Sequence, residues 1–311
     1  MKLPRLAGRV AQWITIGAGV WFLVATARAH WPELARIELA PHAGPLLLAS
    51  ALTGLTYVAL VGGWVWSLRW WSQRLPYLEA LRIWFLANLA RYIPGTLWQF
   101  VGLAAMCRAR GVSAGAATAA VLLQQVVLLA TGLVLTLGLS PRILGDWTAA
   151  QSPFVWAGLV TAGLGVIIVG FPAVAPRLRT LAQRAAGRDL AWPAPPTAAF
   201  GLYVAAMLVP WIVYGAAFHL FAGALLGPAA PGAAVSVAAF VGSYVVGILA
   251  VFAPGGLVVR EAALTVALTP AIGAQNALFL AVTSRLWLVV VELTTALIVL
   301  ATHRVASLRE A

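Results

Sequence analysis

Long apolar segments, separated by short polar turns, follow one another along the whole chain. A helix of about 20 apolar residues is long enough to cross the ~30 Å hydrocarbon core of a bilayer. The pattern therefore predicts an all-α polytopic membrane protein, with a single membrane domain over residues 1–311. The apolar runs span approximately residues 8–28, 44–68, 81–107, 114–138, 154–172, 198–226, 233–268 and 276–302.

Two of these runs contain a Pro-Gly sequence, which interrupts a helix because proline lacks a backbone N–H and clashes with the preceding turn. Pro94-Gly95 has its counterpart in Pro254-Gly255, which follows it by 160 residues (254 − 94), and each is followed by a Gly-containing turn, at Gly111 and at Pro270 to Gly273. Matching interruptions in two halves are typical of transporters with internal repeats. We expect repeat halves of about 1–150 and 151–311.

The distribution of basic residues favours one topology. The chain has a formal net charge of +12, although only 9% of its residues are charged and 62% are hydrophobic. The basic residues lie in short loops between apolar runs, which indicates the positive-inside rule rather than nucleic-acid binding. If both interrupted segments are re-entrant, about six full crossings remain and both termini are cytoplasmic. The cytoplasmic basic residues are then Lys2, Arg5, Arg9, Arg69, Arg74, Arg82, Arg108, Arg110, Arg177, Arg179, Arg184, Arg188, Arg304 and Arg309.

Only Arg28, Arg36 and Arg142 fall outside in this arrangement, whereas the alternative with two spanning segments weakens the charge bias. The re-entrant topology inserts the second half upside down relative to the first, so the two hairpins enter from opposite sides and meet near the bilayer midplane. Lys2, Arg5 and Arg9 precede the apolar run from Val10 to Ala25, which is interpreted as an uncleaved signal anchor, with a cleaved signal peptide as the alternative.

Five charged residues remain inside the apolar segments: Arg91, Arg260, Glu261, Arg285 and Glu292. A charge at the centre of a bilayer costs a few kcal/mol, so such residues ordinarily mark a functional site. We expect Glu261 to pair with Arg285, and Arg260 with Glu292. The other interpretation is that these residues only hold helices together.

Three arginines and two glutamates form a cavity with surplus positive charge, which suits a phosphate-bearing lipid headgroup. In this hypothesis Arg91, Arg260 and Arg285 hold the phosphate while Glu261 and Glu292 balance the charge. The N-termini of the interrupted helices add free N–H groups that favour anions. Gln124 and Gln125 are interpreted as helix–helix hydrogen-bonding residues, with substrate contact as the alternative. The sequence contains no nucleotide-binding or metal-binding motif, so we expect no cofactor and no metal.

The segments "NLARYIPGTLWQFVGLAAMCRARGVS" (Asn88 to Ser113) and "APGGLVVREAAL" (Ala253 to Leu264) resemble the two signatures of the lysylphosphatidylglycerol synthase transmembrane-region family, also called flippase-like domain proteins. In multidomain relatives this region is the bacterial flippase that moves aminoacylated phosphatidylglycerol between leaflets, fused to an aminoacyl transferase. The resemblance implies a bacterial cytoplasmic (inner) membrane protein. It also implies as functional positions Arg91, Pro94, Gly95, Trp98, Gln99, Pro254, Gly255, Gly256, Arg260 and Glu261.

The chain departs from that pattern in two respects. It lacks the transferase domain, so we expect a stand-alone member that does not synthesise the lipid. Gln124 also stands where many relatives have an acidic residue, which puts a proton-linked role there in doubt.

We therefore expect a lipid flippase or transporter rather than an enzyme. Its cargo would be a membrane phospholipid or a lipid-linked sugar with a phosphate head, which the resemblance allows to be aminoacylated or glycosylated. A lipid-synthesising partner enzyme and a homo-oligomer are compatible with the sequence. Two alternatives stay open: a non-transporting scaffold for a lipid-modifying enzyme, and a membrane-embedded transferase that uses a lipid-linked sugar.

Overall fold

The computed structural model describes residues 42–89, 98–139, 195–250 and 258–310, together with residues 28, 163, 165, 170, 176, 177 and 180. Within these residues the chain is helical apart from short connections, and it contains no strand. The helices are α3 (Ala43–Leu68), η1 (Arg69–Trp71), α4 (Tyr77–Leu89), α5 (Trp98–Ala109), α6 (Ala114–Leu139), α8 (Thr197–Leu226), η4 (Gly227–Ala229), α9 (Ala233–Leu249) and α10 (Val259–Glu310).

Four of the described helices are long and apolar enough to cross a membrane: α3 with η1, α6, α8 with η4, and α10. The expectation of an all-α, multi-pass membrane protein is therefore confirmed. The described helices also agree closely with the apolar runs from which they were predicted. The run at 8–28, and most of the run at 154–172, lie outside the described residues.

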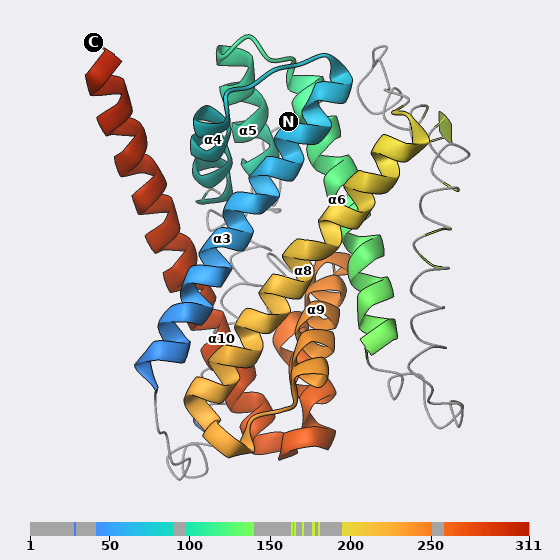
Figure 1. Ribbon diagram of the computed structural model, residues 1–311, viewed down its shortest axis with the longest axis vertical. Helices are drawn as coiled ribbons and strands as arrows, with labels where there is room; N and C mark the ends of the chain where they lie inside the picture. Colours follow the sequence, from blue (N-terminus) through green and yellow to red (C-terminus); the bar gives the residue numbers. More distant parts are fainter. Residues whose placement is uncertain are drawn as a thin grey trace, which may run out of the picture.

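The long helices pack side by side, while α4 and α5 lie next to each other at the end of the molecule where α3 ends (Figure 1). This end, which we call the basic end, carries Arg69, Arg74, Arg82, Arg108 and Arg110. At the opposite end α8 leads into α9, and α10 reverses its direction. The described residues there, 222–236 and 265–280, contain no Lys, Arg, Asp or Glu.

The reversal in α10 takes place at Gly273, whose backbone has φ 78° and ψ 157°. A positive φ costs glycine little but strains residues that carry a Cβ atom. The predicted turn between Pro270 and Gly273 is thus confirmed, and it divides α10 into a first arm (259–272) and a second arm (274–310).

Aromatic side chains and close helix approaches hold the bundle together. Trp66 of α3 and Trp70 of η1 pack edge-on against Tyr203 of α8, whose side chain is fully buried. Gln124 of α6 donates from its Nε2 to the carbonyl of Leu60 at 2.7 Å, so its predicted role in helix–helix hydrogen bonding is confirmed.

Helices α8 and α9 approach each other closely at Gly215. A Cβ atom built on Gly215 would be 2.9 Å from Cα of Val237 and 2.7 Å from one of its methyl carbons. Because the first of these atoms is backbone, a rotamer change cannot relieve the overlap, and α9 would have to move away from α8.

We expect Gly215→Ala to destabilise the protein by about 1–3 kcal/mol, the usual cost of adding a methyl group to a tightly packed interior. Thermal unfolding of the purified protein in detergent measures the change. Gly223→Ala in the same helix is the control, because a Cβ atom there meets nothing within 4 Å. Equal melting temperatures for the two variants would contradict the close packing of α8 on α9.

Candidate functional site

Val258 immediately precedes the first arm of α10, and its backbone conformation is unusual for a β-branched residue. Its φ is 72°, in the left-handed region that valine rarely adopts. The Glu261 carboxylate accepts a hydrogen bond from the Val258 backbone N–H at 2.8 Å through Oε2. A glutamate at this position of a helix satisfies one of the free N–H groups at the start and also favours the positive end of the helix dipole. Glu261 therefore fixes where the helix starts.

The other oxygen of Glu261 faces the second arm of α10. Its Oε1 lies 3.7 Å from Nη1 of Arg285, and the Glu261 side chain is only 5% exposed. The register explains this pair: Glu261 precedes Gly273 by 12 residues and Arg285 follows it by 12, so the antiparallel arms bring them level. The predicted Glu261–Arg285 pair is confirmed.

Arg260 turns instead toward α9 and is almost completely buried, at 4% exposure. The carbon at the centre of its guanidinium lies 3.8 Å from the centre of the Tyr244 ring and 5.2 Å from that of Phe240. A cation over aromatic faces away from water is stabilised by about 2 kcal/mol or more. Its Nε has no hydrogen-bond partner among the described residues, so a buried donor is left for an anion or a water molecule.

A chain of tyrosine hydroxyl groups extends from this guanidinium into the bundle. The Tyr244 hydroxyl is hydrogen-bonded to that of Tyr214 in α8, which in turn lies 3.3 Å from the hydroxyl of Tyr57 in α3. These contacts connect the start of α10 to three other helices through polar groups in an otherwise apolar interior.

Sequence reasoning did not identify these tyrosines as part of the site. Each stands alone in a separate apolar run, where an aromatic residue usually serves packing or marks the membrane interface. The available signal was that a hydroxyl group inside such a run needs a hydrogen-bond partner. Which partner it finds depends on how the helices pack, and a single sequence does not contain that information.

The predicted pair between Arg260 and Glu292 is wrong: these two described side chains form no ion pair. Glu292 follows Gly273 by 19 residues, whereas Arg260 precedes it by 13, so the two differ by six residues, or about 9 Å, along the arms. Glu292 is buried at 2% exposure and makes an interaction of its own. Among the described residues the cluster thus contains Arg260, Glu261, Arg285 and Glu292, and its positive and negative charges are equal in number.

Other predicted site residues lie outside the described part of the chain. They are Arg91, Pro94, Gly95, Pro254, Gly255 and Gly256. Trp98 and Gln99 form the first turn of α5, but their side chains also lie outside the described part of the chain. The surplus positive charge attributed to Arg91 and the meeting of the two interrupted segments therefore stay predictions.

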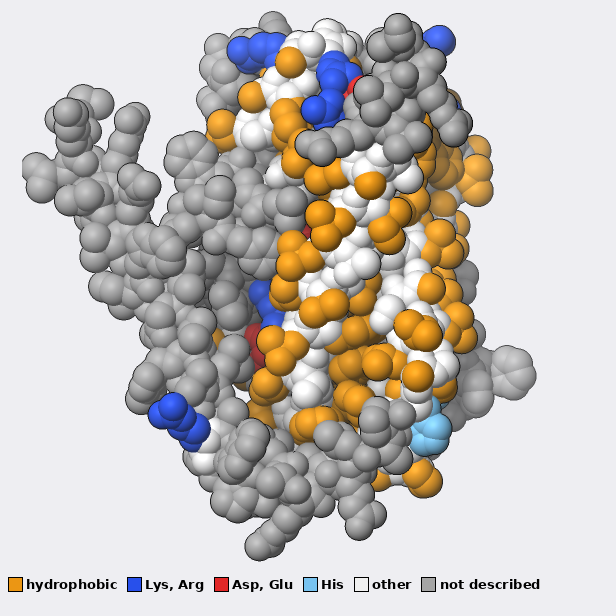
Figure 2. Space-filling view, turned by 90° about the vertical axis from the view of Figure 1, so that its left-hand side faces the viewer, with side chains coloured by type: hydrophobic (Ala, Val, Ile, Leu, Met, Phe, Trp, Pro, Cys, Tyr) orange, Lys and Arg blue, Asp and Glu red, His pale blue; other side chains and the backbone are white. Residues whose placement is uncertain are grey.

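Described charged side chains gather at the basic end and midway along the molecule, and a further basic side chain lies toward the opposite end. Figure 2 shows basic and acidic side chains together midway along one face, beside hydrophobic surface, and a second group of basic side chains at the basic end. Ionic side chains at mid-depth of an apolar bundle are typical of membrane proteins that handle polar or charged ligands. Helices and buried charges together define a multi-pass membrane protein with an ionic cluster in its interior.

Residues 10–295 match the family model of the lysylphosphatidylglycerol synthase TM region. The match covers nearly the whole chain, and the chain belongs to this family. The resemblance seen in its two Pro-Gly segments is thus confirmed, and the family indicates a membrane protein involved in lipid handling. A comparison with curated protein sequences gives no significant match.

We expect Arg285→Gln to destabilise the protein by up to about 3–5 kcal/mol, because it leaves the Glu261 carboxylate buried without a cation. A loss at the lower end of this energy range is expected, since the Arg285 side chain is 22% exposed and water partly screens the ion pair. Adding Glu261→Gln should restore part of the stability, because glutamine still accepts from Val258 N–H and carries no charge. Thermal unfolding of the two single variants and the double variant gives the coupling between the side chains.

Arg108→Gln is the matched control, because Arg108 is exposed at the basic end and forms no ion pair with a described residue. Its melting temperature should equal that of the wild type. A double variant whose loss is the sum of the two single losses would show that Glu261 and Arg285 do not interact.

Proposed function

We propose that this protein moves a phosphate-headed lipid between the leaflets of the bacterial inner membrane, with the headgroup passing the cluster around Arg260. The observation that carries the proposal is a buried arginine whose Nε donor is unsatisfied, in a chain of a lipid-handling family. An oxygen of a phosphate group would supply the missing acceptor, and a charge-assisted bond of this kind is about twice as strong as a neutral one.

The depth of the cluster supports this role. At 1.5 Å per residue, the 12 or 13 residues that separate Gly273 from Glu261, Arg260 and Arg285 amount to about 18–20 Å. The hydrocarbon core is about 30 Å thick. A turn at Gly273 near one membrane surface therefore leaves these charges well inside the bilayer, at a level that a headgroup crosses only during transfer between leaflets.

The short helices support the topology of six crossings and two re-entrant hairpins. Helices α4 and α5 contain 13 and 12 residues, which is about 20 Å and 18 Å and too short to span. They lie at the basic end, while α9 and the first arm of α10 begin and finish at the opposite end (Figure 1). Two hairpins that enter from opposite ends are what an inverted repeat of halves 1–150 and 151–311 requires. By the positive-inside rule the basic end, where α10 finishes, is cytoplasmic, and we propose the same side for the N-terminus.

In this proposal each ionic residue has a separate task. Arg260 binds the phosphate, and the aromatic rings of Tyr244 and Phe240 hold its guanidinium in place. Glu261 keeps the helix start in position through Val258 and holds Arg285 beside the route. Arg285, being partly exposed, is the first of the two arginines that an entering headgroup meets. The protein carries out no chemical step on the lipid.

A transport assay tests the proposal. Protein is reconstituted into vesicles that contain a fluorescent phosphatidylglycerol, and translocation is followed by dithionite quenching of the outer leaflet. We expect Arg260→Gln to lower the rate ten- to a hundredfold, since a hydrogen bond to a charged group contributes about 1.5–3 kcal/mol. Arg108→Gln removes the same charge at the basic end and should transport at the wild-type rate.

The outcomes separate the candidate functions. Wild-type transport that Arg260→Gln leaves unchanged would exclude Arg260 from the route. Wild-type protein that moves neither this lipid nor fluorescent phosphatidylethanolamine would favour the scaffold. A new lipid species, detected by mass spectrometry after incubation with a lipid-linked sugar, would favour the transferase instead.

A further inference from the structure

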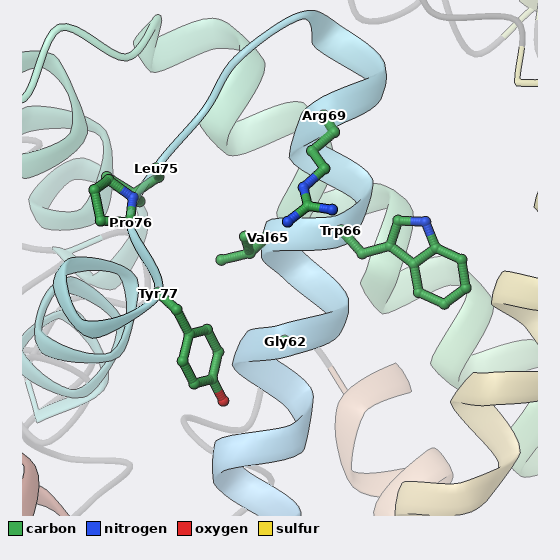
Figure 3. A pocket seen from close by; sticks show the side chains of 7 residues that line it. All are labelled: Gly62, Val65, Trp66, Arg69, Leu75, Pro76 and Tyr77. Carbon is green, nitrogen blue, oxygen red and sulfur yellow. The ribbon is translucent and has the colours of Figure 1, made fainter.

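A groove on the outside of α3 lies at the basic end, far from the ionic cluster. Figure 3 shows it between the last turns of α3 and the segment 75–77, which leads into α4. Its volume is about 520 Å³, and it is lined by Gly62, Val65, Trp66, Arg69, Leu75, Pro76 and Tyr77. A second hollow of about 470 Å³ shares Arg69, Leu75 and Pro76 with it and extends to Arg74. Together the two hollows form one continuous site.

The site is apolar at one side and basic at the other. A Cβ atom on Gly62 would make only van der Waals contact with Tyr77, at 3.9 Å from its ring and 4.0 Å from its hydroxyl oxygen. The Tyr77 hydroxyl donates to the carbonyl of Val58 at 2.6 Å, so the wall that it forms is held against α3. Above this apolar part stand Arg69, whose guanidinium points into the groove in Figure 3, and the exposed Arg74.

The two arginines have no acidic partner within the described part of the chain. The carboxylate at this end, Glu79, is engaged by Arg110 and by Arg82 instead. No acidic side chain is among the described residues that line either hollow. Arg69 and Arg74 therefore present two positive charges, unpaired within the described residues, directly above the apolar part of the groove.

We propose that this groove binds an acidic phospholipid of the leaflet at the basic end. The phosphate lies between Arg69 and Arg74, and an acyl chain follows α3 past Gly62 and Tyr77. This occupant is the one that matches both parts of the site, because a free phosphate would leave the apolar part empty and a neutral lipid would leave the two charges uncompensated. The site does not depend on transport through the interior cluster.

Lipid titration followed by native mass spectrometry tests this proposal. The full-length protein in detergent is titrated with palmitoyl-oleoyl phosphatidylglycerol, and separately with the phosphatidylcholine of the same chains. We expect saturable binding of the acidic lipid, at least tenfold tighter than that of the neutral one. The double variant Arg69→Gln/Arg74→Gln should bind the acidic lipid about thirtyfold more weakly, because it loses the usual attraction of two basic side chains to an anionic headgroup.

The double variant Arg82→Gln/Arg108→Gln is the matched control, since it removes two charges from the same end but not from the groove. Equal weakening in both double variants would overturn the proposal, because the attraction would then belong to the basic end as a whole. Gly62→Leu provides a second test that keeps every charge, and it should also abolish the tight site by filling its apolar part. Unchanged binding in Gly62→Leu, with a wild-type melting temperature, would equally overturn the proposal.

Discussion

The start of α10 depends on the two oxygens of one carboxylate, one in a hydrogen bond and the other in an ion pair. A backbone N–H that is left unpaired inside a bilayer costs several kcal/mol, and an unpaired charge costs still more. Glu261 meets both demands at once: Oε2 accepts from the Val258 N–H, and Oε1 faces Arg285. The valine at that helix start has a positive φ, a conformation that persists only where surrounding contacts impose it. The position of Arg260, one residue before Glu261, follows from the same constraint.

The interior and the basic end use arginine in different physical ways. Arg260 is surrounded by aromatic rings and has lost its water, so an anion that reaches it meets a strong, poorly screened charge. Arg69 and Arg74 are exposed, and salt screens their attraction over about 8 Å at physiological ionic strength. The first environment suits selective recognition of a headgroup, and the second suits continuous occupation by the abundant lipids of the surrounding leaflet.

Apolar run length alone predicted most of the described helices, because helices in a bilayer satisfy all their backbone groups within one segment. The Glu261–Arg285 pair was also predictable, since both residues and the turn at Gly273 are visible in the sequence. The error at Arg260 has a clear cause: its partners are aromatic side chains of α9, and nothing in the local sequence distinguishes Tyr244 from an ordinary packing residue. Contacts between different helices, such as Tyr57 with Tyr214, require their relative rotation, which one sequence does not provide.

The reversal at Gly273 has a mechanical consequence. It is the only residue with a non-helical backbone between two stiff rods, and the ion pair lies about 18 Å from it along both of them. A rotation of one rod by about 10° around this pivot displaces its far end by about 3 Å, which is enough to separate a carboxylate from a guanidinium while every helical hydrogen bond stays intact. A small angular change at this glycine would therefore be enough to make or break the salt bridge between Glu261 and Arg285.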